Sequence, residues 1–292
     1  MYTQFFGNFL LSKGYITNEQ LFDALKEKAQ KHAKLGTLAI HSGLMTAAEV
    51  DSVIVEQTHQ DKKFGELTIE MGYLKDEQVK ELLSIQSPDF LLLGQILLDK
   101  GIIDNTTLEK SIHDYRSENA ISDLDMVLED KDSINHLIGH FFANTGIDPS
   151  AIDIMYLELL FNSFIRFVGD DYTPLSAEIC DSFSADCMVR QDIKGSYAIS
   201  TYIGMSQTTA INFASRYVNE SFSVYDEYVQ ASLDDFLNLN NGLFLVNCSN
   251  DQALELTLTA PEHFDGQTLS FNKACKLKLL YPFGAIHFII EF

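Results

Sequence analysis

Long apolar stretches and secretory features are missing from this chain of 292 residues. No window of about 20 unbroken apolar residues occurs, so we expect no transmembrane helix and no membrane insertion. The first residues, Met1 to Phe6, include no basic side chain, whereas a secretory signal begins with a basic region. These absences predict a cytoplasmic protein.

Cysteine is also scarce. The four cysteines all lie in the second half of the chain and form no C-x-x-C pair: Cys180, Cys187, Cys248 and Cys275. Thiols in a reducing compartment usually stay free, and free cysteine is commonly buried. We therefore expect buried free thiols rather than disulfides.

Basic residues are outnumbered by acidic ones, 20 to 42, which gives a formal net charge of -22. Residues 1–120 carry 12 basic and 18 acidic residues, a net of -6; the remainder carries 8 and 24, a net of -16. A field of this sign repels nucleic acid, so we expect no nucleic-acid partner. It favours a protein partner that presents a basic patch.

What the chain does contain is a repeat marked by glycine. Two series of glycines recur every 29 residues: Gly7, Gly36, Gly65 and Gly94, and Gly14, Gly43, Gly72 and Gly101. A period of this length is typical of stacked units that cannot bury their apolar faces alone. We therefore predict an all-helical tandem-repeat domain of four 29-residue units over residues 1–117.

The helices of these units follow from apolar columns and capping residues. Two equivalent positions are apolar in every unit: Leu21, Val50, Val79 and Leu108, then Leu25, Ile54, Leu83 and Ile112. Residues four apart lie on one helix face, so both columns should pack on a neighbouring unit. Thr17 with Gln20, and Thr46 with Glu49, are capping boxes, and Asp104 can cap the fourth of these helices. The segment between the two glycines of a unit should form a single turn or short helix.

The units resemble the MshEN motif found at the N-termini of type II secretion and pilus ATPases. That motif runs Arg-Leu-Gly, an apolar pair, Gly, two apolar residues and then a helix. Tandem pairs of it bind cyclic di-GMP, so the resemblance implies a nucleotide site in the second and third units. The residues that it implies are Lys34, Gly36, Gly43, Lys63, Gly65 and Gly72.

The arginine of that motif is absent. Its position holds Phe5, Lys34, Lys63 and Leu92 in the four units. Arginine stacks on guanine and forms two parallel hydrogen bonds to phosphate, and lysine does neither in the same way. The alternative is a scaffold or protein-docking module.

Residues 118–148 form an acidic stretch with spaced apolar residues and read as a helical connector. His136 and His140 are four apart and could hold a metal ion. No third ligand accompanies them, so the pattern favours a helix face with two histidines, and we predict no metal site.

Residues 149–292 change to helices and strands. We expect helices at 154–168, 208–219 and 225–241. The expected strands are 197–204, 243–248, 254–259 and 276–292, the last broken by a hairpin at Pro282-Phe283-Gly284. This order predicts an α+β sandwich of helices against a largely antiparallel sheet.

Asp235 and Asn238 share one helix face because they are three residues apart, and Gly242 follows. The layout resembles the CheX/CheC/FliY family of chemotaxis phosphatases, whose signature is Glu-Leu-x-Asn, three residues, Gly and then a strand. The resemblance implies binding of a phosphorylated response-regulator receiver domain and hydrolysis of its phospho-aspartate. Asp235 would pair with the receiver's lysine, and Asn238 would orient the attacking water. The resemblance implies magnesium on the receiver and no cofactor on this chain.

The acid of the signature is shorter here, because aspartate in place of glutamate loses about 1.5 Å of reach. Glu158 and Asn162 are four apart rather than three, so we expect one site. Two alternatives remain: an adaptor or scaffold without catalysis, and a plain solvated helix that ends at Gly242. CheX-like domains pair through sheet edges, and an exposed apolar strand at Ile286–Phe292 would allow a homodimer.

Overall fold

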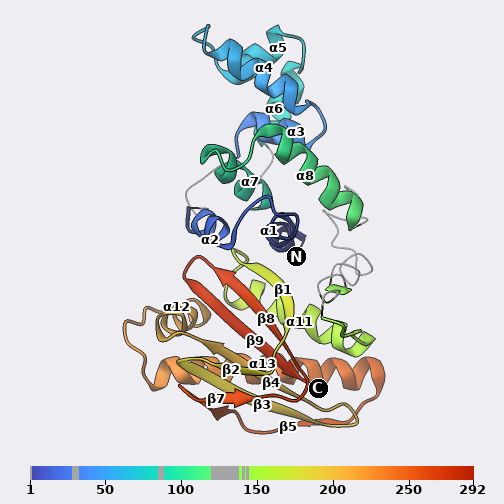
Figure 1. Cartoon of the computed structure of the whole chain (residues 1–292), viewed down its shortest axis with the longest axis vertical. Coiled ribbons are helices and arrows are strands. Elements are labelled where there is room, and N and C mark those ends of the chain that lie inside the picture. Colours follow the sequence, from blue (N-terminus) through green and yellow to red (C-terminus); the bar gives the residue numbers. More distant parts are fainter. Residues whose placement is uncertain (1, 28–32, 85–88, 120–137, 140–141, 143–144) are drawn as a thin grey trace. The chain divides into compact units, whose positions relative to one another are not determined.

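The structure is a computed structural model that describes residues 2–27, 33–84, 89–119, 138–139, 142 and 145–292 (Figure 1). The chain divides into two units, Tyr2–Leu128 and Glu129–Phe292. The division falls within the predicted connector. Most of that connector, with His136 and His140, lies outside the described residues.

The N-terminal unit is helical throughout its described residues. Its helices come in pairs: α1 (Tyr2–Ser12) with α2 (Asn18–Glu27), α3 (Leu35–His41) with α4 (Ala47–Gln57), α5 (Phe64–Glu70) with α6 (Asp76–Ser84), and α7 (Asp89–Asp99) with α8 (Asn105–Glu118). The predicted caps are present. Thr46 and Glu49 form a reciprocal capping box at α4, and the Asp104 carboxylate accepts from the Thr107 N–H at 2.7 Å.

The two glycine series have different structural roles. The second series turns the chain between the helices of a pair in the left-handed region, with φ of 72° at Gly14, 64° at Gly43, 76° at Gly72 and 65° at Gly101. The first series allows close helix packing. A Cβ at Gly36 would lie 2.9 Å from Val50 Cγ1, and one at Gly94 would lie 2.8 Å from Leu108 Cδ1.

Helices α3 and α5 also pack on each other reciprocally. A Cβ at Gly36 would lie 3.2 Å from Phe64 Cζ, and one at Gly65 would lie 3.2 Å from Leu35 Cδ2. Leu35 and Phe64 are equivalent residues one period apart, as are the two glycines. The contact therefore holds two similar helices face to face.

The C-terminal unit contains an antiparallel sheet. Its strands run in the order β1 (Thr173–Ile179), β8 (Ala274–Tyr281), β9 (Gly284–Glu291), β4 (Ile199–Met205), β3 (Cys187–Gly195) and β5 (Leu256–Leu258). β6 (Glu262–His263) also pairs with β3, and β2 (Ser182–Ser184) pairs with β7 (Thr268–Ser270) in a separate ribbon. Every strand pairing among the described residues is antiparallel, so the prediction of helices with an antiparallel sheet is confirmed in outline.

Three helices accompany this sheet: α11 (Ala151–Phe167), α12 (Gln207–Tyr217) and α13 (Glu227–Gln252). α13 contacts β3, β4 and β5 as well as both other helices (Figure 1). Aromatic rings fill the core between them; Phe164 and Phe236 lie 4.7 Å apart between ring centroids, and Tyr156 and Phe244 lie 4.9 Å apart. This packing sets the position of α13, which carries the candidate site.

The predicted strand at 243–248 is wrong, because α13 continues through it to Gln252. Gly242 does not end the helix; its φ is not positive, and a Cβ there would meet nothing within 4 Å. The buried positions keep helical spacing past the glycine, with Phe244 and Cys248 following Asn240 and Asn241. Burial of Phe244 and Cys248 outweighs the weak helix propensity of glycine.

The sequence analysis missed strands β1 and β3. In β3 the buried face includes Gln191, which is 0% exposed, so the apolar alternation that marks a strand is broken there. The expected edge strand at Ile286–Phe292 is also wrong, because β9 pairs on both sides and Ile286, Phe288 and Ile289 are buried.

All four cysteines are buried free thiols. Among the described residues, no helix combines the length and apolar character that crossing a membrane requires.

The packing role of Gly36 is testable with Gly36→Ala. The added methyl would press on Val50 and Phe64, so we expect the unfolding free energy of the N-terminal unit to fall by about 1–3 kcal/mol. Urea unfolding of the full chain, followed by circular dichroism, measures this. In a Val50→Ala background the nearest obstructing atom is gone, so Gly36→Ala should cost less there. Equal costs in both backgrounds would show that Gly36 is not a packing residue.

Candidate functional site

The outward face of α13 carries both residues that the sequence analysis singled out. Asp226 begins the helix, and its carboxylate accepts from the N–H groups of Tyr228 and Val229. Asp235 and Asn238 are both exposed, one turn apart, while Phe236 and Leu237 between them are buried. The helix therefore presents a carboxylate and an amide together to solvent.

The Asp235 carboxylate is held from the α12 side. The Tyr217 hydroxyl donates to Asp235 Oδ2 at 2.6 Å. Burial, and then this hydrogen bond to the carboxylate, raise the pKa of Tyr217, so the phenol stays a donor at neutral pH. Both residues border a pocket of about 350 Å³, with Tyr228 and Phe222 among its walls. One carboxylate oxygen is thus fixed, and no hydrogen bond of Oδ1 is among those described.

The Asn238 amide is held from the sheet. Gln191 Nε2 on β3 donates to Asn238 Oδ1 at 2.8 Å and to the Thr259 carbonyl at 3.0 Å. Gln191 itself is fully buried. This bond engages the Asn238 oxygen, so the NH₂ group of this exposed side chain is the part that can donate to a partner.

Gln191 belongs to a buried network of side-chain amides and hydroxyls. Asn241 Nδ2 donates to Gln191 Oε1 and to Thr201 Oγ1, both at 2.9 Å. The Tyr156 hydroxyl donates to Asn241 Oδ1 at 2.7 Å and accepts from Asn240 Nδ2 at 3.2 Å. Burial raises the pKa of Tyr156 far above its ordinary value, so its phenol remains neutral. The network joins α11, α13, β3 and β4 beneath Asn238.

The sequence analysis missed Gln191, Asn241 and Tyr217. Their partners are 18 to 85 residues away in sequence, so no local spacing reveals them. The only local signal is the run of Asn240 and Asn241 on a helix, because two amides at core positions require buried partners. The alternative of a helix that ends at Gly242 is wrong, as described above.

Gly242 lies on the same outward face, seven residues after Asp235. In a helix interior glycine costs about 1 kcal/mol relative to alanine. No neighbouring atom in the chain excludes a Cβ at this position. The fold therefore supplies no reason for a glycine here, whereas close approach by a partner's backbone would.

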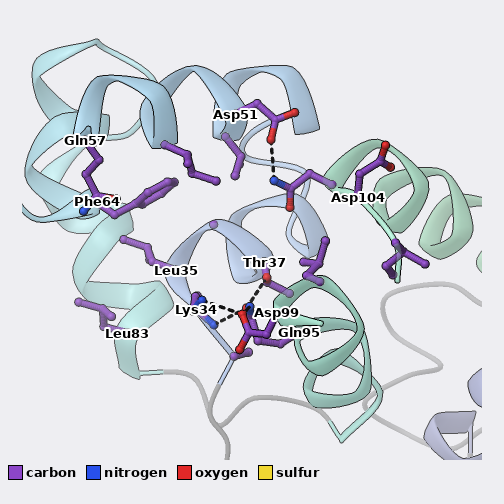
Figure 2. Close-up of a pocket in the computed structure, with 17 residues that line it drawn as sticks. Lys34, Leu35, Thr37, Asp51, Gln57, Phe64, Leu83, Gln95, Asp99 and Asp104 are labelled. Atoms are coloured by element: carbon purple, nitrogen blue, oxygen red, sulfur yellow. Dashed lines mark hydrogen bonds and ion pairs between the residues drawn. The ribbon is translucent and has the colours of Figure 1, made fainter. Parts of the chain in front are cut away.

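The residues implied for cyclic di-GMP do not all line one pocket. A pocket of about 800 Å³ in the N-terminal unit is lined by Lys34 and Gly36 (Figure 2). The other four, Gly43, Lys63, Gly65 and Gly72, do not line it. Lys34 Nζ lies 2.7 Å from Asp99 Oδ1, so its charge is already paired. Nucleotide binding stays a prediction.

Among the described residues, no group of three or more His, Cys, Asp or Glu side chains is arranged to hold a metal ion. The candidate site on α13 offers one carboxylate and one amide. Such a pair can accept from a cation and donate to a bound oxygen, and it suits recognition of another molecule's charged site.

No protein-family model matches the chain, and no curated protein matches it. Among solved structures, the C-terminal half resembles chemotaxis proteins. For CheX from Desulfovibrio desulfuricans the TM-score is 0.42 at 13% identity, covering 48% of this chain and 98% of that chain. For a CheC-like superfamily protein from Shewanella sp. PV-4 the TM-score is 0.41 at 15% identity, covering 47% of this chain and 93% of that one. For a CheX–CheY–BeF3–Mg+2 complex from Borrelia burgdorferi it is 0.38 at 18% identity, covering 47% and 94%. The likeness is one of fold and assigns no activity.

Proposed function

We propose that this protein binds a phosphorylated response-regulator receiver domain through α13 and accelerates hydrolysis of its phospho-aspartate. The observation that carries the proposal is the exposed Asp235 and Asn238 pair, each already oriented by a neighbour of the same domain. The resemblance of this pair and Gly242 to the signature of the chemotaxis phosphatases supports the assignment.

In the proposed reaction, water attacks phosphorus in line with the acyl-phosphate bond. A new phosphorus–oxygen bond forms to the water, the bond to the receiver's aspartate breaks, and the carboxylate leaves. The water's proton passes to solvent or to the released phosphate. Phosphoryl transfer depends mostly on positioning, so one well-placed amide can supply most of the effect. The outward NH₂ group of Asn238 would hold the water oxygen. The magnesium ion would be the receiver's and not this chain's.

Asp235 would form an ion pair with the receiver's lysine. The Tyr217 hydroxyl already donates to Asp235 Oδ2, so the lysine ammonium would donate to Oδ1. Aspartate is shorter than the glutamate of the signature by about 1.5 Å. A side chain held by a tyrosine loses less rotamer freedom on binding, which offsets part of the loss of reach.

The second candidate function is an adaptor that grips the receiver without hydrolysis. The short acid favours it, because a misplacement of about 1 Å can cost on the order of a hundredfold in rate. A scaffold without either activity is the third. Homodimerisation is also part of the proposal, and β1 and β5 stand at the two ends of the described strand order.

Asn238→Ala separates the two functions. The receiver of the same cell, charged with acetyl phosphate, should lose phosphate faster when the wild-type protein is added. We expect Asn238→Ala to reduce that acceleration by about a hundredfold and to change binding little, because the amide acts on the water. Asn250→Ala, an exposed asparagine near the end of α13, is the matched control and should behave as wild type. If the wild type binds the receiver without accelerating dephosphorylation, the protein is an adaptor. If it neither binds nor accelerates, the scaffold is the remaining function.

Gly242→Leu tests whether the outward face of α13 is the docking surface. Leucine has a far better helix propensity than glycine and meets no obstacle here, so the unfolding free energy should rise by up to about 1 kcal/mol. The added side chain would stand between the helix and its partner, so we expect receiver affinity to fall by about tenfold or more. Calorimetric titration against the receiver measures this. Asn250→Leu, at an exposed position of α13 about 80° around the helix from Gly242, is the control. Unchanged affinity for Gly242→Leu would place the receiver elsewhere.

A further inference from the structure

The helix pairs of the N-terminal unit differ in one column of apolar residues. Leu25 in α2 and Ile112 in α8 are buried, at 2% and 5% exposed. Their equivalents Ile54 in α4 and Leu83 in α6 are 45% and 66% exposed. The sequence repeats an apolar residue at all four positions, but the chain covers only two of them.

The difference follows the length of the helices that pack against this column. α2 contacts α7, and α8 contacts α1; α1 and α7 each have 11 residues. α4 contacts α5 and also the 14-residue α8, and α6 contacts α3; α3 and α5 each have 7 residues. Relative to the 29-residue period, α1 begins four residues earlier than α3, and α7 begins four residues earlier than α5, which is about one helical turn.

The extra turn of the longer helices brings buried apolar side chains. Phe5 in α1 and Phe90 and Leu91 in α7 are 3%, 2% and 0% exposed. At the position of Phe5, the second and third pairs have Lys34 and Lys63, which precede their helices as extended residues. The first helices of the first and fourth pairs, α1 and α7, thus have an apolar turn that the first helices of the second and third pairs, α3 and α5, lack.

Ile54 and Leu83 line one pocket of about 800 Å³, a size typical of ligand-binding sites. Leu35 and Phe64 complete its apolar wall. In Figure 2 Phe64, Leu35 and Leu83 lie along one side. The pocket therefore brings together the uncovered side chains of both short-helix pairs.

The charged residues of the lining are mostly acidic. Asp51, Asp99 and Asp104 line the pocket, and among the described residues of its walls Lys34 is the only basic one. Lys34 is paired with Asp99. Asp51 accepts from the Asn105 amide at 2.7 Å, and the hydrogen bonds from Thr107 lower the pKa of Asp104, which favours its charged form. Three carboxylates against one lysine favour a cationic occupant over a dinucleotide with two phosphates.

We propose that this pocket receives an amphipathic helix of a partner protein. Apolar side chains spaced three and four residues apart along that helix would pack on Ile54 and Leu83, as in other helix-in-groove complexes. Lysine or arginine on its flanks would face Asp51 and Asp104. The partner thereby supplies the helical turn that α1 and α7 supply elsewhere in the unit. This proposal concerns a different unit from the α13 site and stands or falls separately.

The test uses the full chain and a designed helical peptide of about 14 residues. The peptide carries Phe and Leu at i and i+4 on one face and Lys and Arg beside them, and its binding is followed by fluorescence anisotropy. We expect saturable binding, weakened by about tenfold or more in the Ile54→Ser, Leu83→Ser double variant. Both residues are exposed, so the variant should fold. A peptide with Glu in place of Lys and Arg should bind about tenfold more weakly.

Val55→Ser is the matched control. Val55 is 58% exposed and adjacent to Ile54, but it does not line the pocket, so this variant should bind as wild type. The proposal is overturned by any of four results. Two concern the peptide: no saturable binding up to about 1 mM, or equal affinity of the wild type and the double variant for it. The other two concern different occupants: the wild type binds cyclic di-GMP and the double variant does not, or the wild type sediments as a dimer and the double variant as a monomer.

Discussion

The amide–amide contact between Asn241 and Gln191 is the interaction on which the candidate site depends. Both side chains are fully buried, where an unpaired amide would cost about 1–3 kcal/mol. Each therefore needs buried partners and supplies one to the other, and the contact ties α13 to β3. Gln191 accepts from Asn241 and keeps two N–H groups; it donates one to the Thr259 carbonyl and the other to Asn238. A structural requirement of the core thus orients an exposed side chain, and that is how the fold positions a functional group without a cofactor.

Local signals in the sequence predicted much of this molecule. The capping residues and the shared helix face of Asp235 and Asn238 are encoded within a few residues, and the structure has the caps and the helix at these positions. The end of α13 could not be predicted, because burial of Phe244 and Cys248 decides it and a single glycine does not. β3 was missed for a related reason: Gln191 looks like a surface residue until its partners on α13 are known. The supports of the site, Gln191 and Tyr217, are long-range contacts that spacing does not reveal.

The N-terminal unit shows the same division between local and long-range information. Its 29-residue period marks where helices begin and which positions are apolar, but not which helices meet. α1 packs on α7, at the other end of the repeat array, and α3 packs on α5. Leu25 is covered in α2, which contacts the 11-residue α7, whereas Ile54 is exposed in α4, which contacts the 7-residue α5. Equivalent residues in a degenerate repeat therefore divide into core and surface according to their partners.

The most direct measurement of the central claim is the lifetime of the phosphorylated receiver in the presence of Gln191→Met. Methionine keeps the length and volume of glutamine but removes the bond that orients Asn238, while Asn241 retains Thr201 and Tyr156. The account predicts that receiver binding persists and that the acceleration of dephosphorylation falls by about tenfold or more. A folded Gln191→Met protein that binds the receiver and dephosphorylates it at the wild-type rate would contradict it.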